Sequence, residues 1–128
     1  MAITYRLDPR PDDDALGEFW RAAWNGEPPP TFAPVLARSL VHACAYDGAR
    51  LVGYVNVATD GGVHAFLLDT SVHPDYQRRG IATELVRLVT VAARERGAHW
   101  LHVDFEPHLE TFYAGCGFRP TVAGLIRL

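Results

Sequence analysis

Residues 69–96 read DTSVHPDYQRRGIATELVRLVTVAARER, and this stretch decides how the chain folds. The pattern predicts the end of a buried strand, a tight loop at 77–82, and a long helix that begins directly after the loop. A helix start has backbone N–H groups without internal partners and partial positive charge. Gly80 lets the chain turn sharply and lets a ligand approach the backbone. With the cations of Arg78 and Arg79 beside it, the loop predicts a cradle for a phosphate or pyrophosphate.

The long helix alone would fit any structural βαβ unit, so only the loop bears on function. Apolar residues recur at helical spacing and predict one stripe that packs on a sheet: Ile81, Leu85, Leu88, Val89 and Ala92. A purely structural βαβ unit does not explain the Gln-Arg-Arg-Gly sequence at 77–80, which has no hydrophobic role. The loop lacks the Gly-Lys-Ser/Thr of a Walker-type phosphate site, and it lacks the G-x-G-x-x-G of a dinucleotide site.

Two motifs in the right order resemble those of one known family. The run V-x-P-x-Y-Q-x-x-G-I-A, from Val72 to Ala82, closely resembles the acyl-CoA-binding segment of the GNAT family of N-acetyltransferases, whose signature is Q/R-x-x-G-x-G/A. Downstream, FYAGCGF at 112–118 resembles the F-Y-x-x-x-G-F helix of that family. A predicted strand lies between them. The signatures cover about half the chain, and the N-terminal half fits the family by element order only.

The resemblance implies an acetyl-CoA-dependent N-acetyltransferase and a set of site residues. Those implied in acetyl-CoA binding are Thr70, Val72, His73, Gln77, Arg78, Arg79, Gly80, Ile81, Ala82 and Thr83. In the family, a backbone N–H on the fourth strand, here near Val72, polarises the thioester carbonyl. The family's tyrosine, here Tyr113, protonates the departing thiolate. A phenol of pKa ~10 is nearly matched to a thiol of pKa ~8.5. Tyr113 could instead be only a core aromatic residue beside Phe112.

The general base stays open in the sequence. Many family members have an asparagine seven residues before the tyrosine, where this chain has Glu106. This departure puts one cofactor contact in question, and it could bring a carboxylate near the substrate amine. A water relay is one candidate for the base, and the side-chain candidates are Asp69, His102, Asp104 and Glu106.

The acceptor is also open. Four aromatic residues fall where the family has its acceptor-binding helices, although such residues more often belong to the core: Phe19, Trp20, Trp24 and Phe32. The acidic run at 12–14 would suit a cationic amine, but a run of this kind usually caps a helix.

Cysteine and histidine spacing gives no metal signature. Cys44 and Cys116 lack zinc or C-x-x-C spacing and are interpreted as reduced core thiols. Six possible ligands lie on strands or loops that can converge, but none has H-x-x-x-H or H-E-x-x-H spacing: His64, Asp69, His73, His102, Asp104 and His108. We therefore expect no metal cofactor.

Length and composition predict one ordinary globular domain over residues 1–128, with 48% hydrophobic and 21% charged residues. A net charge of −3 gives no general attraction to nucleic acid. The first residues lack the apolar stretch of a signal peptide, and no run approaches the ~20 apolar residues of a membrane span. We therefore expect a cytoplasmic protein without a membrane partner.

The pattern along the chain predicts a mixed α/β fold in the order β-α-α-β-β-β-α-β-α-β. The predicted strands are 3–7, 41–46, 51–58, 64–72, 100–105 and a terminal one from Phe118 or 122–128. The first predicted helix begins after residues 12–14, and three further helices are predicted at 32–40, 81–96 and 109–116. Strands 64–72 and 100–105 should be parallel through a right-handed crossover, and the others antiparallel. This order resembles the GNAT fold, in which the one parallel pair splays apart and the pantetheine arm enters the gap.

The leading hypothesis is direct acetyl transfer, in a ternary complex, to a primary amine of a small molecule or of a peptide or protein N-terminus. The alternatives are a non-catalytic acyl-CoA-binding sensor and an interaction domain of the same fold. Tyr113 favours the enzyme, because a binder needs no proton donor beside the sulfur. Family members are often dimers, so a homodimer is an open option.

Overall fold

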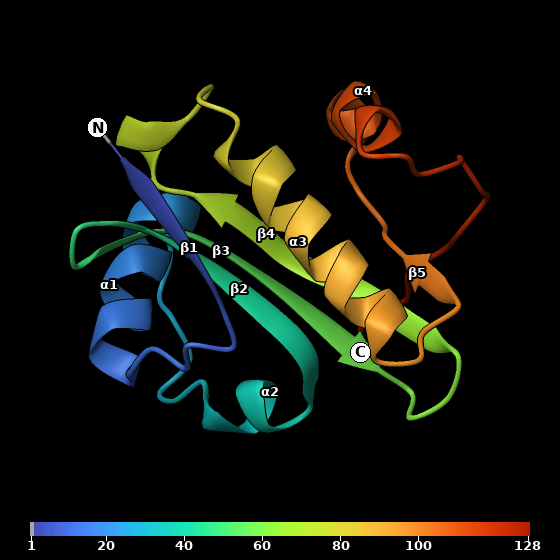
Figure 1. Cartoon of the computed structure of the whole chain (residues 1–128), viewed down its shortest axis with the longest axis horizontal. Helices are drawn as coiled ribbons and strands as arrows, with labels where there is room; N and C mark the ends of the chain where they lie inside the picture. Colours follow the sequence, from blue (N-terminus) through green and yellow to red (C-terminus); the bar gives the residue numbers. More distant parts are fainter. Residues whose placement is uncertain (1) are drawn as a thin grey trace.

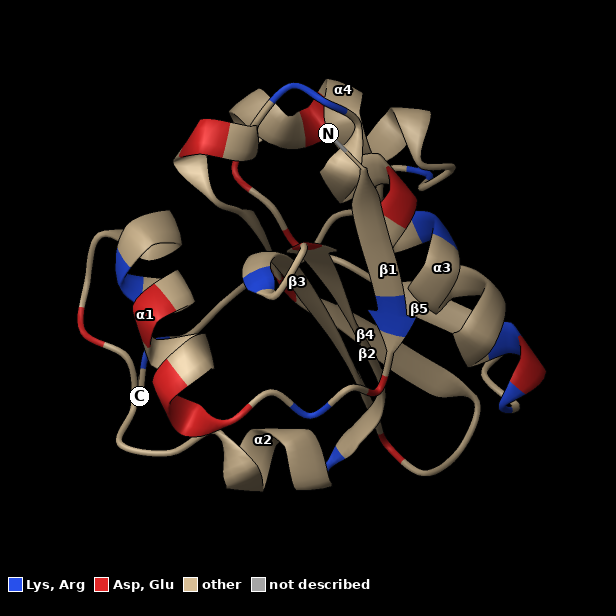
Figure 2. Ribbon diagram, turned by 60° about the vertical axis from the view of Figure 1, so that its left-hand side comes forward, with Lys and Arg blue, Asp and Glu red and all other residues tan. Residues whose placement is uncertain are grey.

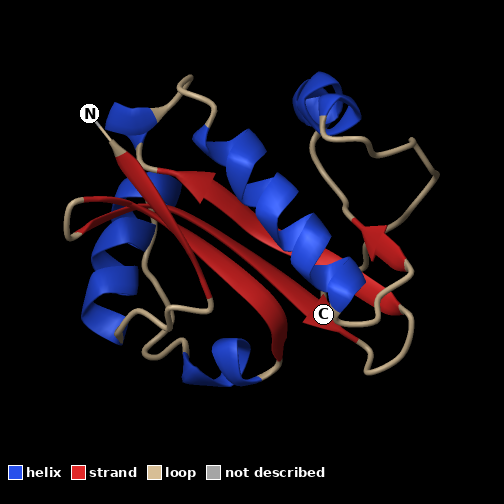
Figure 3. Ribbon diagram, in the orientation of Figure 1, coloured by secondary structure: helices blue, strands red, loops and turns tan. Residues whose placement is uncertain are grey.

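The computed structural model describes residues 2–128, which form one five-stranded sheet in the order β1-β2-β3-β4-β5 (Figure 3). The strands are β1 (Ile3–Leu7), β2 (Ser39–Asp47), β3 (Arg50–Thr59), β4 (His64–Val72) and β5 (Trp100–His102). The helices are α1 (Asp13–Trp24), α2 (Ala33–Ala37), α3 (Ile81–Glu95) and α4 (Glu110–Gly115). Single 3-10 turns, η1 (Pro74–Tyr76) and η2 (Pro107–Leu109), precede α3 and α4.

The sheet separates two helical layers, with α3 on one face and α1 and α2 on the other (Figures 1 and 2). Because side chains alternate along a strand, neighbouring residues of β2 enter different cores. Ala43 and Ala45 belong to the core beneath α3, together with Leu85. Cys44 belongs to the core beneath α1 and α2, together with Phe19. Residues from the N-terminal third of the chain thus cover the β2 and β3 part of the face that α3 leaves open.

Local sequence signals explain where α1 and α3 begin and end. Asp12 caps α1 by accepting a hydrogen bond from the Ala15 N–H at 2.8 Å, and Asn25 ends the helix in a left-handed conformation. Gly80, with φ of +78°, begins α3, and Gly97, with φ of +101°, follows its last turn. α3 therefore occupies almost the whole of the predicted range 81–96.

At β4 the sheet changes from antiparallel to parallel strand pairing. β4 pairs antiparallel with β3, and it pairs parallel with β5 only from His64 to Phe66. A bulge interrupts the β3–β4 ladder, because Tyr54 pairs with Ser71 while Asn56 pairs with Leu68. The second half of β4 therefore has no partner in β5, and the mixed α/β fold with one splayed parallel pair is confirmed.

Two predicted elements are shorter in the structure. The fifth strand ends at His102 instead of residue 105, because the next apolar side chains leave the strand and pack around the α3 core. The second helix ends at Ala37 instead of residue 40, because Ser39 already pairs with Ala58 of β3. The last helix is Glu110–Gly115 behind a 3-10 turn, close to the predicted 109–116.

The predicted terminal strand is wrong. Residues 118–128 form no strand, and the side chains of Val122 and Leu128 are fully exposed. Phe118 is drawn toward the Tyr113 ring, whose centroid lies 5.8 Å away, and Pro120 has no N–H to donate to a ladder. The three-residue β5 also offers a very short edge for pairing. None of the helices within residues 2–128 has the length and apolar character needed to cross a membrane.

Candidate active site

A cleft of about 560 Å³ is lined by residues from the end of β4, the loop before α3 and the segment that leads into α4. The start of α3 and α4 lie in the upper part of Figure 1. The volume of the cleft is in the range of small-molecule sites. Its lining residues are Thr70, Ser71, Val72, Tyr76, Gln77, Arg78, Gly80, Ile81, Ala82, Thr83, His108, Leu109, Phe112 and Tyr113. The cleft exists because β5 leaves β4 after Phe66, so side chains from α4 face β4 across a gap.

The loop before α3 exposes the start of that helix to the cleft. Arg78 and Gly80 both have left-handed backbone conformations, with φ of +62° and +78°. No side chain caps the first turn of α3, so its N–H groups at Ile81, Ala82 and Thr83 lack the usual capping acceptor. A Cβ added to Gly80 would meet no atom within 4 Å, so this side of the loop is open. Unsatisfied N–H groups at an open helix start form an anion site.

Tyr76 fastens the loop to the β2–β3 hairpin. Its hydroxyl donates a hydrogen bond to the Asp47 carboxylate. The guanidinium groups of Arg79 and Arg50 lie 5.3 and 5.6 Å from its ring centroid, within cation–π distance. Arg50 also contacts the His73 ring, with 3.1 Å between Nη2 and Nε2. The loop is thus held beside several cations, which favours a negatively charged ligand.

Tyr113 is both a core residue and part of the cleft wall. It is only 7% exposed, and its ring stacks on Phe105 with 4.8 Å between centroids. Burial raises the pKa of the Tyr113 phenol, and the nearby hydroxyl of Thr70 opposes this shift. The Thr70 hydroxyl itself has no hydrogen-bond partner of normal geometry among the described residues. The phenol therefore keeps its proton at neutral pH and can serve as a proton donor.

Most of the residues implied in acetyl-CoA binding line the cleft together with Tyr113. They are Thr70, Val72, Gln77, Arg78, Gly80, Ile81, Ala82 and Thr83. His73 and Arg79 do not line it. His73 instead accepts a hydrogen bond from the Asp75 N–H and contacts Arg50, and Arg79 lies over the Tyr76 ring.

The sequence interpretation missed five lining residues: Ser71, Tyr76, His108, Leu109 and Phe112. Tyr76 adjoins Gln77 in the quoted motif, so the motif itself contained a signal for it. Phe112 was noted only as a neighbour of Tyr113. Ser71 lines the cleft because the bulge turns consecutive residues of β4 toward it, and a single sequence gives no signal for a bulge.

The four side-chain candidates for the general base are not gathered at one point. Asp69 lies in the β4 bulge with φ of +59°, and burial raises the pKa of its carboxyl group. His102 pairs with His64, with 2.8 Å between the ring nitrogens. Asp104 is near enough to Tyr113 for its charge to raise the pKa of the phenol. Glu106 is exposed at the start of η2.

The aromatic and acidic residues near the N-terminus have structural roles. Phe19 and Phe32 are 2% and 3% exposed and belong to the core beneath α1 and α2, whereas Trp24 is 47% exposed. Asp12 caps α1, and Asp13 accepts a hydrogen bond from the Phe32 N–H at 2.8 Å. The acidic run therefore fastens α1 to the segment before α2.

The thiols and histidines form no shared site. Cys44 is buried, and burial raises the pKa of its thiol to about 12; Cys116 is half-buried, and burial raises its thiol pKa as well. Both cysteines are free. Within residues 2–128, no three His, Cys, Asp or Glu side chains are grouped as metal ligands would be.

Comparisons of the sequence and of the structure with known proteins point to the same family. The sequence model of the acetyltransferase (GNAT) family matches residues 10–118. A GNAT-family acetyltransferase from Streptococcus pneumoniae TIGR4 has 26% identity and a TM-score of 0.84, with 99% of this chain and 98% of that chain covered. AAC(6')-Iy, solved in complex with the bisubstrate analogue CoA-S-monomethyl-acetylneamine, has 16% identity and a TM-score of 0.77, with 100% and 98% covered, and shows the fold alone.

A shorter sequence match links the chain to a named enzyme. Mycothiol acetyltransferase of Mycobacterium ulcerans (strain Agy99) is 35% identical over 60 residues. The match covers 47% of this chain and 19% of that protein. The chain therefore corresponds to about a fifth of that relative's length.

Proposed function

The chain belongs to the acetyltransferase (GNAT) family, and from this premise we propose that it transfers an acetyl group from acetyl-CoA to a primary amine of a small molecule or of a peptide N-terminus. Family membership supports acyl transfer in general. The dependence on acetyl-CoA, the amine acceptor and the assignment of each residue are parts of the proposal.

The observation that carries the proposal is the pairing of two features in one cleft. The loop at 77–80 presents the uncapped start of α3 to this cleft, flanked by Arg78. Tyr113 lines the same cleft with a buried, protonated phenol. An anion cradle and a proton donor in one cleft suit a thioester whose carrier contains a pyrophosphate. A core packing role explains the position of the Tyr113 ring, but it does not require the open helix start.

The residues of the cleft can serve three roles in acetyl transfer: cofactor binding, polarisation of the thioester and proton donation. The α3 N–H groups and Arg78 hold the pyrophosphate of acetyl-CoA, which supplies an activated acetyl thioester when it is bound. Backbone N–H groups of β4 beyond Phe66 have no partner strand in β5, so those near Val72 are candidate donors to the thioester oxygen. The phenol of Tyr113 gives its proton to the sulfur as the amide forms.

A screen of amines with a free-thiol readout tests the proposal. Acetyl-CoA should raise the unfolding temperature, and at least one class of amine should release CoA thiol faster than the hydrolysis control. Stabilisation by acetyl-CoA with no turnover on any amine would identify a non-catalytic acyl-CoA-binding domain. No stabilisation by CoA or acetyl-CoA would point to an interaction domain that keeps only the fold.

A further inference from the structure

Two histidines face each other across the parallel strands β4 and β5. Nδ1 of His64 lies 2.8 Å from Nε2 of His102, and the ring centroids are 5.0 Å apart. Their strand neighbours Ala65 and Leu101 pack in the core beneath α3, so both imidazole rings lie on the opposite face of the sheet. His64 is half-buried and His102 is exposed, so the pair is open to solvent.

The two strands fix the positions of both rings. His64 is opposite Trp100 in the ladder, and Phe66 is opposite His102. The two histidines are therefore diagonal neighbours on one face of the sheet. The Phe66 ring stacks on the His102 ring with 4.8 Å between centroids, which holds the imidazole in place. Because the rings are already placed, they lose little conformational freedom when they bind a common ligand.

The facing nitrogens can act as a chelating pair. In a hydrogen bond between two neutral imidazoles, the N–H of one ring points at the lone pair of the other. A change of tautomer moves the proton of the donating ring to its outer nitrogen, so that both facing nitrogens, Nδ1 of His64 and Nε2 of His102, have lone pairs. This exchange neither adds nor removes a proton from the pair. Neutral imidazole nitrogens are common ligands of transition metals.

The distance between the nitrogens indicates the class of metal ion. At a metal–nitrogen distance of about 2.0 Å, two ligands at a right angle are about 2.8 Å apart, whereas two ligands of a tetrahedral site are about 3.3 Å apart. The observed 2.8 Å matches the right-angled pair. Right angles between nitrogen ligands are typical of tetragonal Cu²⁺ and Ni²⁺, Zn²⁺ prefers a tetrahedron, and Mg²⁺ and Ca²⁺ prefer oxygen.

The surroundings of the pair favour a cation that exchanges with solvent. The Asp60 carboxylate accepts hydrogen bonds from the Gly62 N–H at 2.8 Å and from the His64 N–H at 3.3 Å, so a negative charge lies beside the backbone of His64. Within residues 2–128, no third His, Cys, Asp or Glu side chain is grouped with the pair as a ligand. Water would therefore complete the coordination, and the ion would be exchangeable.

We propose that His64 and His102 together bind one divalent transition-metal ion, Cu²⁺ or Ni²⁺ in preference to Zn²⁺, and that the ion ties β5 to β4 where the two strands part. The ladder between these strands ends at the pair formed by Phe66 and His102, so the ion holds its last rung. Neither histidine lines the cleft described above, so this site is separate from the candidate active site and has no part in the proposed acetyl transfer.

Calorimetric titration of the untagged full-length protein with NiCl₂ tests the site. We expect one ion per chain, bound more weakly than Cu²⁺ and more tightly than Zn²⁺, with a Kd for Ni²⁺ of about 50 µM or lower. His64→Gln and His102→Gln should each weaken Ni²⁺ binding by roughly tenfold or more, because a single imidazole remains. The matched control is His99→Gln, an exposed histidine directly before β5, which should bind Ni²⁺ as wild type does.

Two further measurements distinguish a chelate that joins the strands from separate surface sites. The double variant of His64→Gln and His102→Gln should bind Ni²⁺ within about twofold of the weaker single variant, because the first substitution already removes the chelate. About 0.5 mM Ni²⁺ should raise the unfolding temperature of wild type and of His99→Gln by about 3 °C or more, because both ligands are in place only in the folded chain. The rise should be lost in each single variant of the pair.

Three results would overturn the proposal. They are Ni²⁺ affinity within threefold of wild type in either single variant of the pair, an equal loss of affinity in His99→Gln, and binding of Ni²⁺ to wild type without a rise in unfolding temperature. If a variant does not fold, NMR of wild type alone decides the question. Substoichiometric Cu²⁺ should broaden the ring signals of His64 and His102 before those of the other four histidines, and uniform broadening of all six would refute the site.

Discussion

At the scale of single residues, Gly80 is the position where backbone conformation and proposed ligand binding coincide. Its φ of +78° lies in a region that other residues occupy at a cost of roughly 1–3 kcal/mol. Arg78, two residues earlier, has φ of +62° and bears this cost. Backbone strain is often found at ligand-binding sites. The strain at Arg78 therefore supports the proposal that this loop binds a ligand.

Gly80→Val should abolish binding of acetyl-CoA while the protein still folds. The branched side chain would fill the open side of the loop, where a Cβ meets no protein atom, and it would resist the left-handed φ. The measurement is the rise in unfolding temperature on adding acetyl-CoA. Gly97→Val is the matched control, because Gly97 has φ of +101° at the other end of α3, also with an open Cβ position. Both variants should be destabilised, but only Gly80→Val should lose the response; an equal response would refute the anion-cradle assignment.

Tyr113→Phe should lower kcat by roughly ten- to ten-thousandfold and change acetyl-CoA affinity much less. Only the hydroxyl is removed, so the ring keeps its stacking on Phe105 and its edge contact with Phe112. The proton is needed when charge develops on sulfur, so the loss appears in kcat. The check is single-turnover kinetics, with Tyr5→Phe on β1 as the control. Wild-type turnover when chemistry limits the rate, or global unfolding of the variant, would show that Tyr113 is only a core residue.

Individual site residues could be predicted where a short motif includes them. The residues from Gln77 to Thr83 are contiguous, and those that line the cleft do so because one helix start presents them together. His73 and Arg79 lie in the same stretch, but they turn toward Arg50 and Tyr76, and the direction of a loop side chain depends on distant neighbours. Ser71 could not be predicted either, because the bulge that exposes it depends on the pairing with β3.

At the scale of elements, the position of α3 depends on Gly53 of β3. A Cβ at Gly53 would lie 3.0 Å from Ile81 Cγ2, 3.0 Å from Leu85 Cδ1 and 3.1 Å from Ala45 Cβ. A side chain at this position would therefore be in tighter contact than is usual, and the Ile81 and Leu85 side chains of α3 would have to give by a few tenths of an ångström. Because Ile81 also lines the cleft, this close approach fixes where the helix start lies.

Gly53→Ala should destabilise the protein by about 1–3 kcal/mol, because the added methyl group overpacks a filled core. It should also weaken acetyl-CoA binding, because the Ile81 and Leu85 side chains must shift by a few tenths of an ångström and Ile81 lines the cleft. Urea unfolding and acetyl-CoA titration measure the two effects. Gly115→Ala is the control: its Cβ meets nothing within 4 Å and it lies in α4, so stability should be unchanged or slightly higher. A Gly53→Ala variant as stable as wild type would show that the helix does not depend on this contact.

Helices and strands were predicted well where a single hydrophobic periodicity extends over the whole element. The α3 stripe and the alternation of β4 gave their bounds almost to the residue. The fifth strand was predicted too long, because Val103 and Phe105 alternate as a strand would but pack around the α3 core and Tyr113. The terminal strand was predicted from apolar residues that have no edge to pair with in this chain. In both cases, whether a strand formed depended on whether a neighbouring strand was available for pairing, and the local sequence pattern does not give that information.

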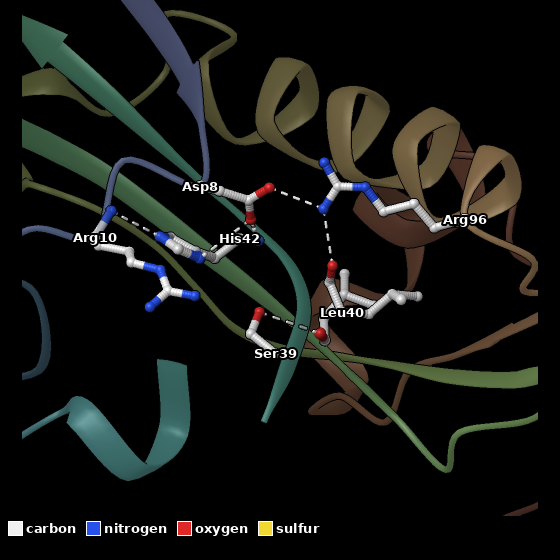
Figure 4. Close-up of polar contacts among 7 residues, drawn as sticks. Asp8, Arg10, Ser39, Leu40, His42 and Arg96 are labelled. Atoms are coloured by element: carbon white, nitrogen blue, oxygen red, sulfur yellow. Dashed lines mark hydrogen bonds and ion pairs between the residues drawn. The ribbon is translucent and has the colours of Figure 1, made fainter. Parts of the chain in front are cut away.

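At the scale of the whole molecule, a polar cluster fastens the C-terminal end of α3 to β2 and to the chain that follows β1 (Figure 4). The Asp8 carboxylate accepts hydrogen bonds from the His42 N–H at 3.0 Å and from Arg96 Nη1 at 2.8 Å. Arg96 also donates to the Leu40 carbonyl at 2.8 Å. The Arg10 N–H donates to His42 Nε2 at 3.1 Å. The cluster joins the chain after β1, the strand β2 and the last turn of α3, at the end opposite Gly80.

The protonation state of His42 follows from these contacts. Nε2 accepts the Arg10 N–H, so the ring is neutral and its proton lies on Nδ1, 3.4 Å from the Asp8 carboxylate. Burial lowers the pKa of His42 below its ordinary 6.5; Asp8 opposes this shift, and the charges of Arg10 and Arg96 add to it. The hydrogen bonds from His42 and Arg96 outweigh burial and hold the pKa of the Asp8 carboxyl below its usual value.

These shifts predict that the protein loses stability in two separate pH ranges. His42 is neutral when folded, whereas in the unfolded chain it takes up a proton as the pH falls through about 6.5. Its contribution is therefore complete above about pH 6.5 and is lost as the pH falls from there toward the lowered folded pKa, at a slope of at most about 1.4 kcal/mol per pH unit. The contribution of Asp8 is present above its unfolded pKa and is lost only at lower pH, as the pH falls through its own folded pKa.

Urea unfolding of wild type and His42→Gln at pH 7.5, 6.5 and 5.5 measures the first range. The variant should be less stable at pH 7.5, because the Arg10 N–H loses its acceptor, but its free energy of unfolding should fall less between pH 6.5 and 5.5. The other five histidines remain in both proteins, so the difference in slope reports His42 alone. Asp8→Asn serves as the second variant and should keep the loss between pH 6.5 and 5.5 while changing the acid limb below about pH 4. Equal slopes for wild type and His42→Gln would mean that His42 takes up a proton in the folded protein as readily as in the unfolded chain, and would contradict the predicted shift of its pKa.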